Sequence, residues 1–356
     1  MRKLLPAIIM GVGAFLLVLG LLLKFYAYPR LAVVPLDQNS RQVVQDPNAT
    51  FFDADNVEPG GGELTTVATV IGRPSDAEQA SEETDQDLAV WELGTKSDNN
   101  DDDMPMAASQ ETVVFDRHTG MAVNCCGESL DGQEVQHQGL TVKFPFDAQP
   151  TDEYEWWDST TRQAYPVTYE DTEELQGMEV YRYTMEVPLT KYTEMELPGQ
   201  LFGQADDSGA VTADRYYSNK RTFWVDPVTG VVLDRTEEQH QEFQYDNQTV
   251  DALDTVSRFT EDTVNQNVED YKSKSMLLKG VQTTFSIPLI IIGALLLIGG
   301  LIFSIVAGRN RRLENEPAYA TGPDPVFGDQ PQQGSYPADG RSGPDDQTQR
   351  RRDLHG

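Results

Sequence analysis

The chain has few cysteines and few histidines, and each shortage excludes a class of protein. Its 356 residues include two cysteines and four histidines. Two cysteines are too few for a small fold held together by several disulfides. The histidines lack the spacing of a zinc site, so neither a metal site nor a metal cofactor is predicted. They are His118, His137, His240 and His355.

Basic residues are scarce relative to acidic ones. Lys and Arg number 27 against 58 Asp and Glu, which gives a formal net charge of −31. This charge repels the phosphates of DNA and RNA, so no nucleic acid partner is expected. The chain also lacks a P-loop, a G-x-S-x-G elbow and a G-x-G-x-x-G motif after a strand. We therefore predict no enzyme and no cofactor, with a carboxylate pair for glycoside cleavage as the remaining alternative.

The two cysteines, Cys125 and Cys126, are adjacent. They can close a vicinal disulfide, stay reduced or pair between chains, and the sequence leaves these states open. Two passive small residues are the simpler interpretation. The acidic run 97–103 is predicted to be an exposed loop, because it lacks the spaced ligands and the glycine of a calcium loop.

Only two stretches, 4–23 and 287–307, are long and apolar, and each matches the roughly 20 residues that cross a bilayer. Arg2 and Lys3 precede the first, and arginines 309, 311 and 312 follow the second. The positive-inside rule then predicts two cytoplasmic ends. The first run is longer than the apolar core of a signal peptide and lacks a small-x-small cleavage site, so we expect an uncleaved anchor.

These spans divide the chain into four predicted parts in the plasma membrane. They are an anchor (1–24), an extracytoplasmic β-rich domain (25–286), a second transmembrane helix (287–308) and a disordered cytoplasmic tail (309–356). A long juxtamembrane helix is predicted at about 254–279 from a stripe of apolar residues. In the second span, Gly293, Gly299 and Gly300 either let another helix approach, as in an oligomer, or are simply tolerated in lipid.

Alternation of apolar and polar residues dominates between residues 64 and 246 and predicts many short strands. We therefore predict a mainly β domain, an antiparallel sandwich or a barrel-like sheet, flanked by two transmembrane helices. The predicted strands are 64–71, 88–93, 113–115, 140–144, 179–187, 222–225, 231–234 and 238–245.

A D-x-x-T-G pattern occurs twice, from Asp116 to Gly120 and from Asp226 to Gly230. In such a pattern the aspartate side chain can accept hydrogen bonds from the turn, and the glycine can adopt a positive φ. Both segments are predicted to be tight hairpin turns. They either mark a duplicated half-domain or, more simply, use one common turn sequence twice.

An aromatic cluster with neighbouring carboxylates is the least generic segment of the chain. Aromatic rings beside acids can stack on sugars or line a groove for acyl chains, and the alternative is packing in the core. The candidate ligand-binding residues are Phe144, Phe146, Tyr154, Trp156, Trp157 and Asp158.

These motifs, in this order, resemble the actinobacterial DUF3068 family, also named porin PorA. The resemblance covers residues 1–308 and rests on the anchor, both D-x-x-T-G turns, the helix before the last span, and three short motifs. The motifs are Lys-Phe-Pro-Phe at 143–146, Trp-Trp-Asp at 156–158 and Gly-Met-Glu-Val-Tyr at 177–181. The resemblance implies a cell envelope protein connected with maturation of lipoglycans such as lipomannan and lipoarabinomannan.

We therefore expect a non-enzymatic envelope protein that supports lipoglycan maturation or transport. Its expected partners are a membrane lipid or lipoglycan intermediate and envelope biosynthesis proteins. The alternative is an oligomeric porin or channel component, because two helices alone form no closed barrel. The lack of charged residues in either apolar run counts against an ion path.

Overall fold

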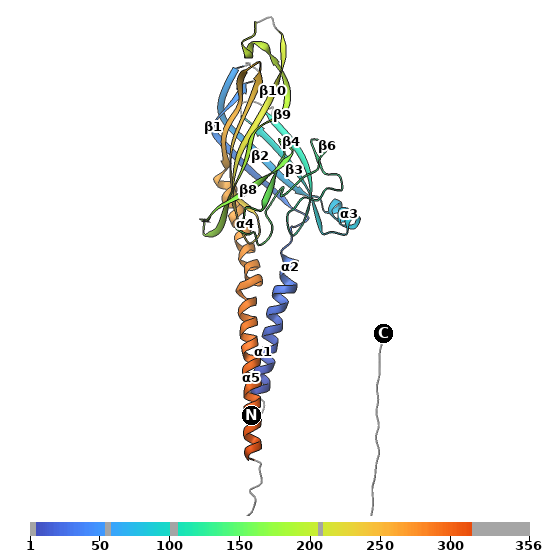
Figure 1. The fold of residues 1–356 in the computed structure, drawn as a ribbon, viewed down its shortest axis with the longest axis vertical. Coiled ribbons are helices and arrows are strands. Elements are labelled where there is room, and N and C mark those ends of the chain that lie inside the picture. The colour runs from blue at the N-terminus through green and yellow to red at the C-terminus, as the bar shows by residue number, and fades with distance from the viewer. Residues whose placement is uncertain (1–4, 54–57, 100–105, 206–208, 315–356) are drawn as a thin grey trace, which may run out of the picture. The chain divides into compact units, whose positions relative to one another are not determined.

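The computed structural model describes residues 5–53, 58–99, 106–205 and 209–314 (Figure 1). Its compact part ends at Ser304, and beyond it the structure describes only the end of a helix. The helices are α1 (Leu5–Leu22), η1 (Leu23–Ala27), α2 (Tyr28–Leu31), α3 (Pro74–Thr84), η2 (Gly199–Phe202), α4 (Glu261–Lys279), η3 (Gly280–Thr284) and α5 (Ser286–Glu314).

The described residues form one antiparallel sheet of 12 strands in the order β6-β5-β4-β3-β2-β1-β12-β11-β10-β9-β8-β7. The strands are β1 (Asn39–Asp53), β2 (Glu58–Gly72), β3 (Leu88–Asp98), β4 (Ala107–Asp116), β5 (Ser129–Leu130), β6 (Gln133–Glu134), β7 (Tyr154–Asp158), β8 (Gln163–Leu175), β9 (Met178–Pro198), β10 (Ala210–Val225), β11 (Val232–Tyr245) and β12 (Gln248–Phe259). The prediction of a mainly antiparallel β fold is confirmed. The architecture is a single sheet that does not close by strand pairing.

Isolated bridges connect the two ends of this open sheet. Phe115 of β4 pairs with Ala122, Met121 pairs with Leu140, and Leu140 pairs with Trp156 of β7. The sheet therefore curves until its ends approach each other through the segment between β4 and β7. We call the face that surrounds the main core the inner face and the opposite one the outer face.

Most predicted strands lie within longer strands of the sheet, but the prediction for 140–144 is wrong. In that segment Leu140 makes only isolated bridges, and the following residues form a loop that runs past two turns. The predicted strands 231–234, apart from its first residue, and 238–245 are parts of the single strand β11. Of the acidic run 97–103, residues 97 and 98 belong to β3, and 100–103 lie outside the described residues.

The juxtamembrane helix begins seven residues later than predicted. Residues 254–259 belong to β12, where Phe259 is buried and Val256 is 58% exposed, so the apolar spacing there follows a strand. Thr260 then caps α4 by accepting a hydrogen bond from the backbone N–H of Thr263, at 3.3 Å. This cap fixes the helix start at Glu261.

The main hydrophobic core lies on the inner face and is rich in aromatic residues. Phe144, Trp156, Tyr183, Phe223 and Leu233 belong to it, and each is at most 5% exposed. The apolar stripe of α4 joins the same core. On the outer face, α3 packs its alanines against the lower part of β3 and β4. Helices α3 and α4 thus cover the sheet at the end nearest the two long apolar helices.

Two helical stretches are long and apolar enough to cross a membrane. The first runs from Leu5 to Leu31 and the second from Glu261 to Val306. They contain all but one terminal residue of each span predicted at 4–23 and 287–307, and both continue beyond these spans on the side of the sheet. Of the tail predicted at 309–356, residues 309–314 extend α5, and 315–356 lie outside the described residues.

Candidate functional site

The two apolar helices pack side by side through glycines (Figure 1). A Cβ atom on Gly293 would lie 2.5 Å from the backbone N of Leu17, and one on Gly13 would lie 2.9 Å from the carbonyl O of Gly293. Gly20 and Gly300 face the partner helix in the same way, each seven residues from the other glycine on its helix. Small residues such as glycine at a helix interface allow the backbones of two helices to approach closely. Gly299, also singled out from the sequence, has no atom within 4 Å.

Each of the two helices contains a π turn, and the two turns are in contact. They are η1, after α1, and η3, between α4 and α5. Single π turns inside α-helices occur frequently at functional sites. In this chain, both π turns lie between the apolar part of their helix and the sheet.

Both D-x-x-T-G segments are turns closed by their aspartates. Asp116 Oδ1 accepts hydrogen bonds from the backbone N and the Oγ1 of Thr119, at 2.7 and 2.8 Å. Asp226 Oδ2 accepts the equivalent pair from Thr229, at 3.2 and 2.6 Å. The closing glycines, 120 and 230, have φ values of 75° and 73°.

Each turn also contacts the chain that leads to a different apolar helix. In the first turn, Arg117 exchanges hydrogen bonds with Val34, just after α2, through its carbonyl O at 3.0 Å and its Nε at 2.9 Å. In the second turn, Asp226 accepts a hydrogen bond of 3.0 Å from Ser275 of α4. The two turns therefore fix the two helical segments to the sheet.

Residues 143–148 connect the turns to each other. The backbone N of Phe144 donates to the carbonyl O of Gly230 at 2.8 Å, and that of Phe146 donates to His118 O at 3.4 Å. Ala148 also donates to Pro227 O at 2.7 Å. We call the two turns together with residues 143–148 the joint, because this unit links both helical segments.

Lys143 is buried within the joint. Its Nζ lies 3.7 Å from the centre of the Phe146 ring and has no hydrogen-bond partner among the described residues. Burial lowers the pKa of Lys143 to about 7, against the attraction of Asp226 and Asp116. Lys143 lines neither the pocket on β1–β4 nor the pocket on β9–β11.

The six candidate ligand-binding residues lie in or beside the core. Four of them, Phe144, Trp156, Trp157 and Asp158, are at most 5% exposed, and Phe146 and Tyr154 are partly buried. The Phe144 ring stacks on Tyr183 with centroids 4.7 Å apart. None of the six lines either of the two pockets that the structure describes. Their arrangement favours the packing interpretation.

A buried polar cluster, unrecognised from the sequence, connects the two ends of the sheet. Glu111 of β4 accepts hydrogen bonds from Trp157 Nε1 at 2.9 Å and from Ser159 Oγ at 2.9 Å. His137 lies between two carboxylates, with Nε2 at 2.9 Å from Glu111 and Nδ1 at 2.7 Å from Glu128. Because these residues are far apart in sequence and have ordinary spacing, no local signal identifies them.

A second buried cluster lies on the inner face of β10 and β11. Glu237 forms ion pairs with Arg221 at 2.9 Å and Arg235 at 3.1 Å. Asp158 joins it by accepting a hydrogen bond of 3.0 Å from Tyr217. Burial raises the pKa of Glu237, but the two guanidiniums outweigh it and lower the pKa to about 2. The two carboxylates of the cluster balance its two guanidiniums in charge, and the cluster fills the inner face at β10 and β11.

Cys125 and Cys126 are bonded to each other.

A group of potential metal ligands that the sequence did not predict lies on β11 and β12. His240, Glu242 and Asp251 lie with their ligand atoms within 4.8 Å of one another. His240 and Glu242 are already paired at 3.2 Å, and such groups are common on acidic surfaces.

Comparison with known proteins identifies the family of this chain. The family model described as Porin PorA matches residues 5–302. A protein named Porin PorA from Corynebacterium amycolatum is 23% identical and covers 75% of this chain and 85% of its own length. One of the same name from Corynebacterium resistens is 22% identical and covers 88% of this chain and all of its own. The chain therefore belongs to the porin PorA family.

Proposed function

We propose that this chain is a non-enzymatic subunit of an oligomeric membrane channel. The observation that carries the proposal is the glycine-packed pair of membrane-length helices in a member of the porin PorA family. The relatives above are named porins, which supports the channel alternative more than a role in lipoglycan maturation. The burial of the aromatic cluster removes the main argument for a lipoglycan-binding groove.

In the part of one copy that the structure describes, the two apolar helices leave no path for water between them. The two helices pack directly against each other, and their remaining faces are apolar and exposed, as at Phe15 (64%) and Leu295 (63%). The sheet does not supply a lipid-facing barrel, because charged residues such as Arg41, Lys220 and Glu238 project from its outer face. A pore therefore requires helices from several copies, which is the reason for proposing an oligomer.

The proposed orientation places both chain ends in the cytoplasm and the sheet on the extracytoplasmic side of a cell-envelope membrane. Its support is the group of arginines after the second apolar run and the two basic residues before the first.

The test is electrical recording from the purified full chain in planar lipid bilayers. We expect discrete conductance steps from wild-type protein. The variant Gly293→Leu should give none, because its side chain would overlap the backbone of α1. Gly299→Leu is the matched control, since position 299 has no atom within 4 Å. Folded wild-type protein without conductance would overturn the proposal.

A further inference from the structure

The disulfide between Cys125 and Cys126 lies in a tight turn that is open to solvent. Cys126 and Gly127 are the central residues of this turn, and the backbone N of Glu128 donates to the carbonyl O of Cys125 across it at 3.4 Å. Cys126 is exposed, and a Cβ atom on Gly127 would meet no atom within 4 Å. Cys125 instead packs against the apolar cluster beneath α3. A reagent in solution can therefore approach Cys126.

The backbone conformation of this turn is unfavourable for a cysteine. The φ values of Cys126 and Gly127 are 62° and 84°. Positive φ at both central residues is typical of a type I′ turn, in which glycine, asparagine and aspartate are preferred. The hydrogen bond that closes the turn is long, so the bond between the two sulfurs is an important constraint on it. Opening the disulfide removes this constraint and allows the turn to relax.

Glu128, the residue after the turn, connects it to the buried cluster at which the two ends of the sheet meet. Glu128 is 6% exposed. Its Oε2 accepts a hydrogen bond from the backbone N of His137 at 3.3 Å and lies 2.7 Å from His137 Nδ1. His137 in turn contacts Glu111, which accepts from Trp157 of β7. Relaxation of the turn therefore displaces the carboxylate that holds His137.

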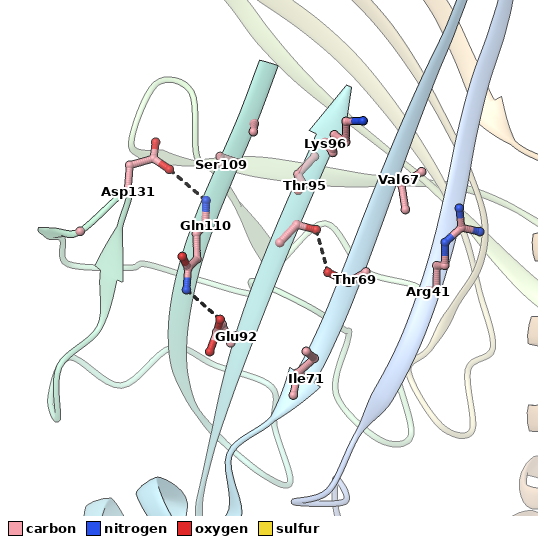
Figure 2. Close-up of a pocket in the computed structure, with 13 residues that line it drawn as sticks. Arg41, Val67, Thr69, Ile71, Glu92, Thr95, Lys96, Ser109, Gln110 and Asp131 are labelled. Atoms are coloured by element: carbon pink, nitrogen blue, oxygen red, sulfur yellow. Dashed lines mark hydrogen bonds between the residues drawn. The ribbon is translucent and has the colours of Figure 1, made fainter. Parts of the chain in front are cut away.

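Beyond Glu128 the chain is fixed to β4 independently of the cysteines. The backbone N of Asp131 donates to Gln110 O at 2.7 Å, and the backbone N of Gln110 donates to Asp131 Oδ1 at 2.9 Å. Figure 2 shows the second of these contacts at the side of the pocket on β1–β4. Because β5 also pairs with β4, a change at the disulfide is concentrated on residues 125–128.

We propose that the pair Cys125 and Cys126 is a reversible thiol–disulfide exchange site, and that its reduction by a dithiol loosens the contact between the two ends of the sheet. A thiolate of the dithiol attacks Cys126 Sγ, the bond between the two cysteine sulfurs breaks, and Cys125 leaves as a thiolate that takes up a proton. The second thiol of the reagent attacks the mixed disulfide and releases Cys126 as a thiol. Two electrons pass to the cysteines, and the reagent becomes a disulfide. This inference goes beyond the proposed channel and does not depend on it.

Hydrogen exchange of the full chain in detergent, with and without dithiothreitol, tests the link. Alkylation of new thiols, counted by mass, reports the reduction. We expect the folded wild type to gain two thiols and to exchange at least tenfold faster in residues 135–142 and 154–158, with no change in β10. Folded protein that dithiothreitol does not reduce, or reduction without faster exchange in these two segments, would overturn the inference.

Two variants separate the redox step from the contact that transmits it. Glu128→Gln keeps the disulfide but removes the carboxylate that holds His137, so reduction should still release two thiols with less than a twofold further change in exchange. The double variant Cys125→Ser with Cys126→Ser should exchange like reduced wild type and should not respond to dithiothreitol. A full response in Glu128→Gln, or any response in the double variant, would reject the inference.

Discussion

At the scale of single residues, Gly230 meets two separate constraints. Its φ of 73° lies in the left-handed region, which costs other residues about 1 kcal/mol. In addition, a Cβ atom there would overlap the carbonyl oxygens of Phe144 and Pro145. The D-x-x-T-G pattern in the sequence predicts the first constraint. The second depends on a loop more than 80 residues away, and no local pattern reveals it.

We expect Gly230→Ala to lower the free energy of unfolding by on the order of 3 kcal/mol, from backbone strain plus overlap. Gly127→Ala is the matched control. Gly127 has a φ of 84° but no atom within 4 Å, so only the strain of about 1 kcal/mol applies. Thermal unfolding of the detergent-solubilised protein measures both. Equal melting temperatures for the two variants would contradict the contact between the turn and residues 144–145.

His137 gives stability a dependence on pH. Burial disfavours its charged form, but hydrogen bonds to Glu111 and Glu128 outweigh this and raise its pKa to about 9. Because this value exceeds the unfolded pKa of about 6.5, the stabilisation is complete below pH about 6.5 and is lost as the pH rises through about 9. The stability difference between wild type and His137→Gln should therefore shrink across this range. Urea unfolding at several pH values measures it, and a constant difference would refute the ion-paired histidine.

At the scale of elements, alternation predicted the strands in which it is regular, such as the first half of β9. The strand β1 was missed because Pro47 interrupts its pattern. Next to Pro47 the pairing of β1 with β12 shifts register, and hydrogen bonds to the Asp46 side chain replace the missing backbone hydrogen bonds. Its Oδ2 accepts from Thr255 Oγ1 at 2.8 Å and from the backbone N of Val256 at 2.7 Å.

Replacing this carboxylate should weaken the junction between the first and last strands. Asp46→Ala removes both of these hydrogen bonds and the one that Oδ1 accepts from Asn48 N, so we expect a loss of about 2 kcal/mol or more in the free energy of unfolding. Hydrogen exchange should speed up in β1 and β12 and stay unchanged in β9. The exposed Asp251→Ala on β12 is the control. Uniform acceleration over the whole sheet would show that Asp46 does not act locally.

At the scale of the whole molecule, the two apolar runs predicted the two long apolar helices, and the alternation of apolar and polar residues predicted the mainly β class. The buried clusters around Glu111 and Glu237 could not be predicted, because they join strands distant in sequence. The same is true of the joint, which unites three segments. The six aromatic and acidic residues proposed as a ligand site were recognisable as unusual, but sequence alone did not distinguish a groove from a core.

The proposed orientation predicts which parts of the chain a membrane-impermeant maleimide can reach. Asn247→Cys, in the turn between β11 and β12, should be labelled in intact spheroplasts. Ser342→Cys, near the C-terminus, should be labelled only after lysis. The native cysteines are bonded to each other and should not react. Labelling of position 342 in intact spheroplasts would reverse the orientation.

The pairing of β1 with β12 has a consequence for the order of events during biosynthesis. Val44 lies opposite Phe259, so more than 200 residues must be made before the first strand gains its second neighbour. Until then the chain carries an unpaired edge of 15 residues, which is a template for wrong pairing. The missing strand ends at Phe259, and α4 and the second apolar run follow at once. A nascent chain therefore completes its sheet only just before its second apolar run is made, so in the proposed orientation the sheet finishes folding as that run becomes available for insertion.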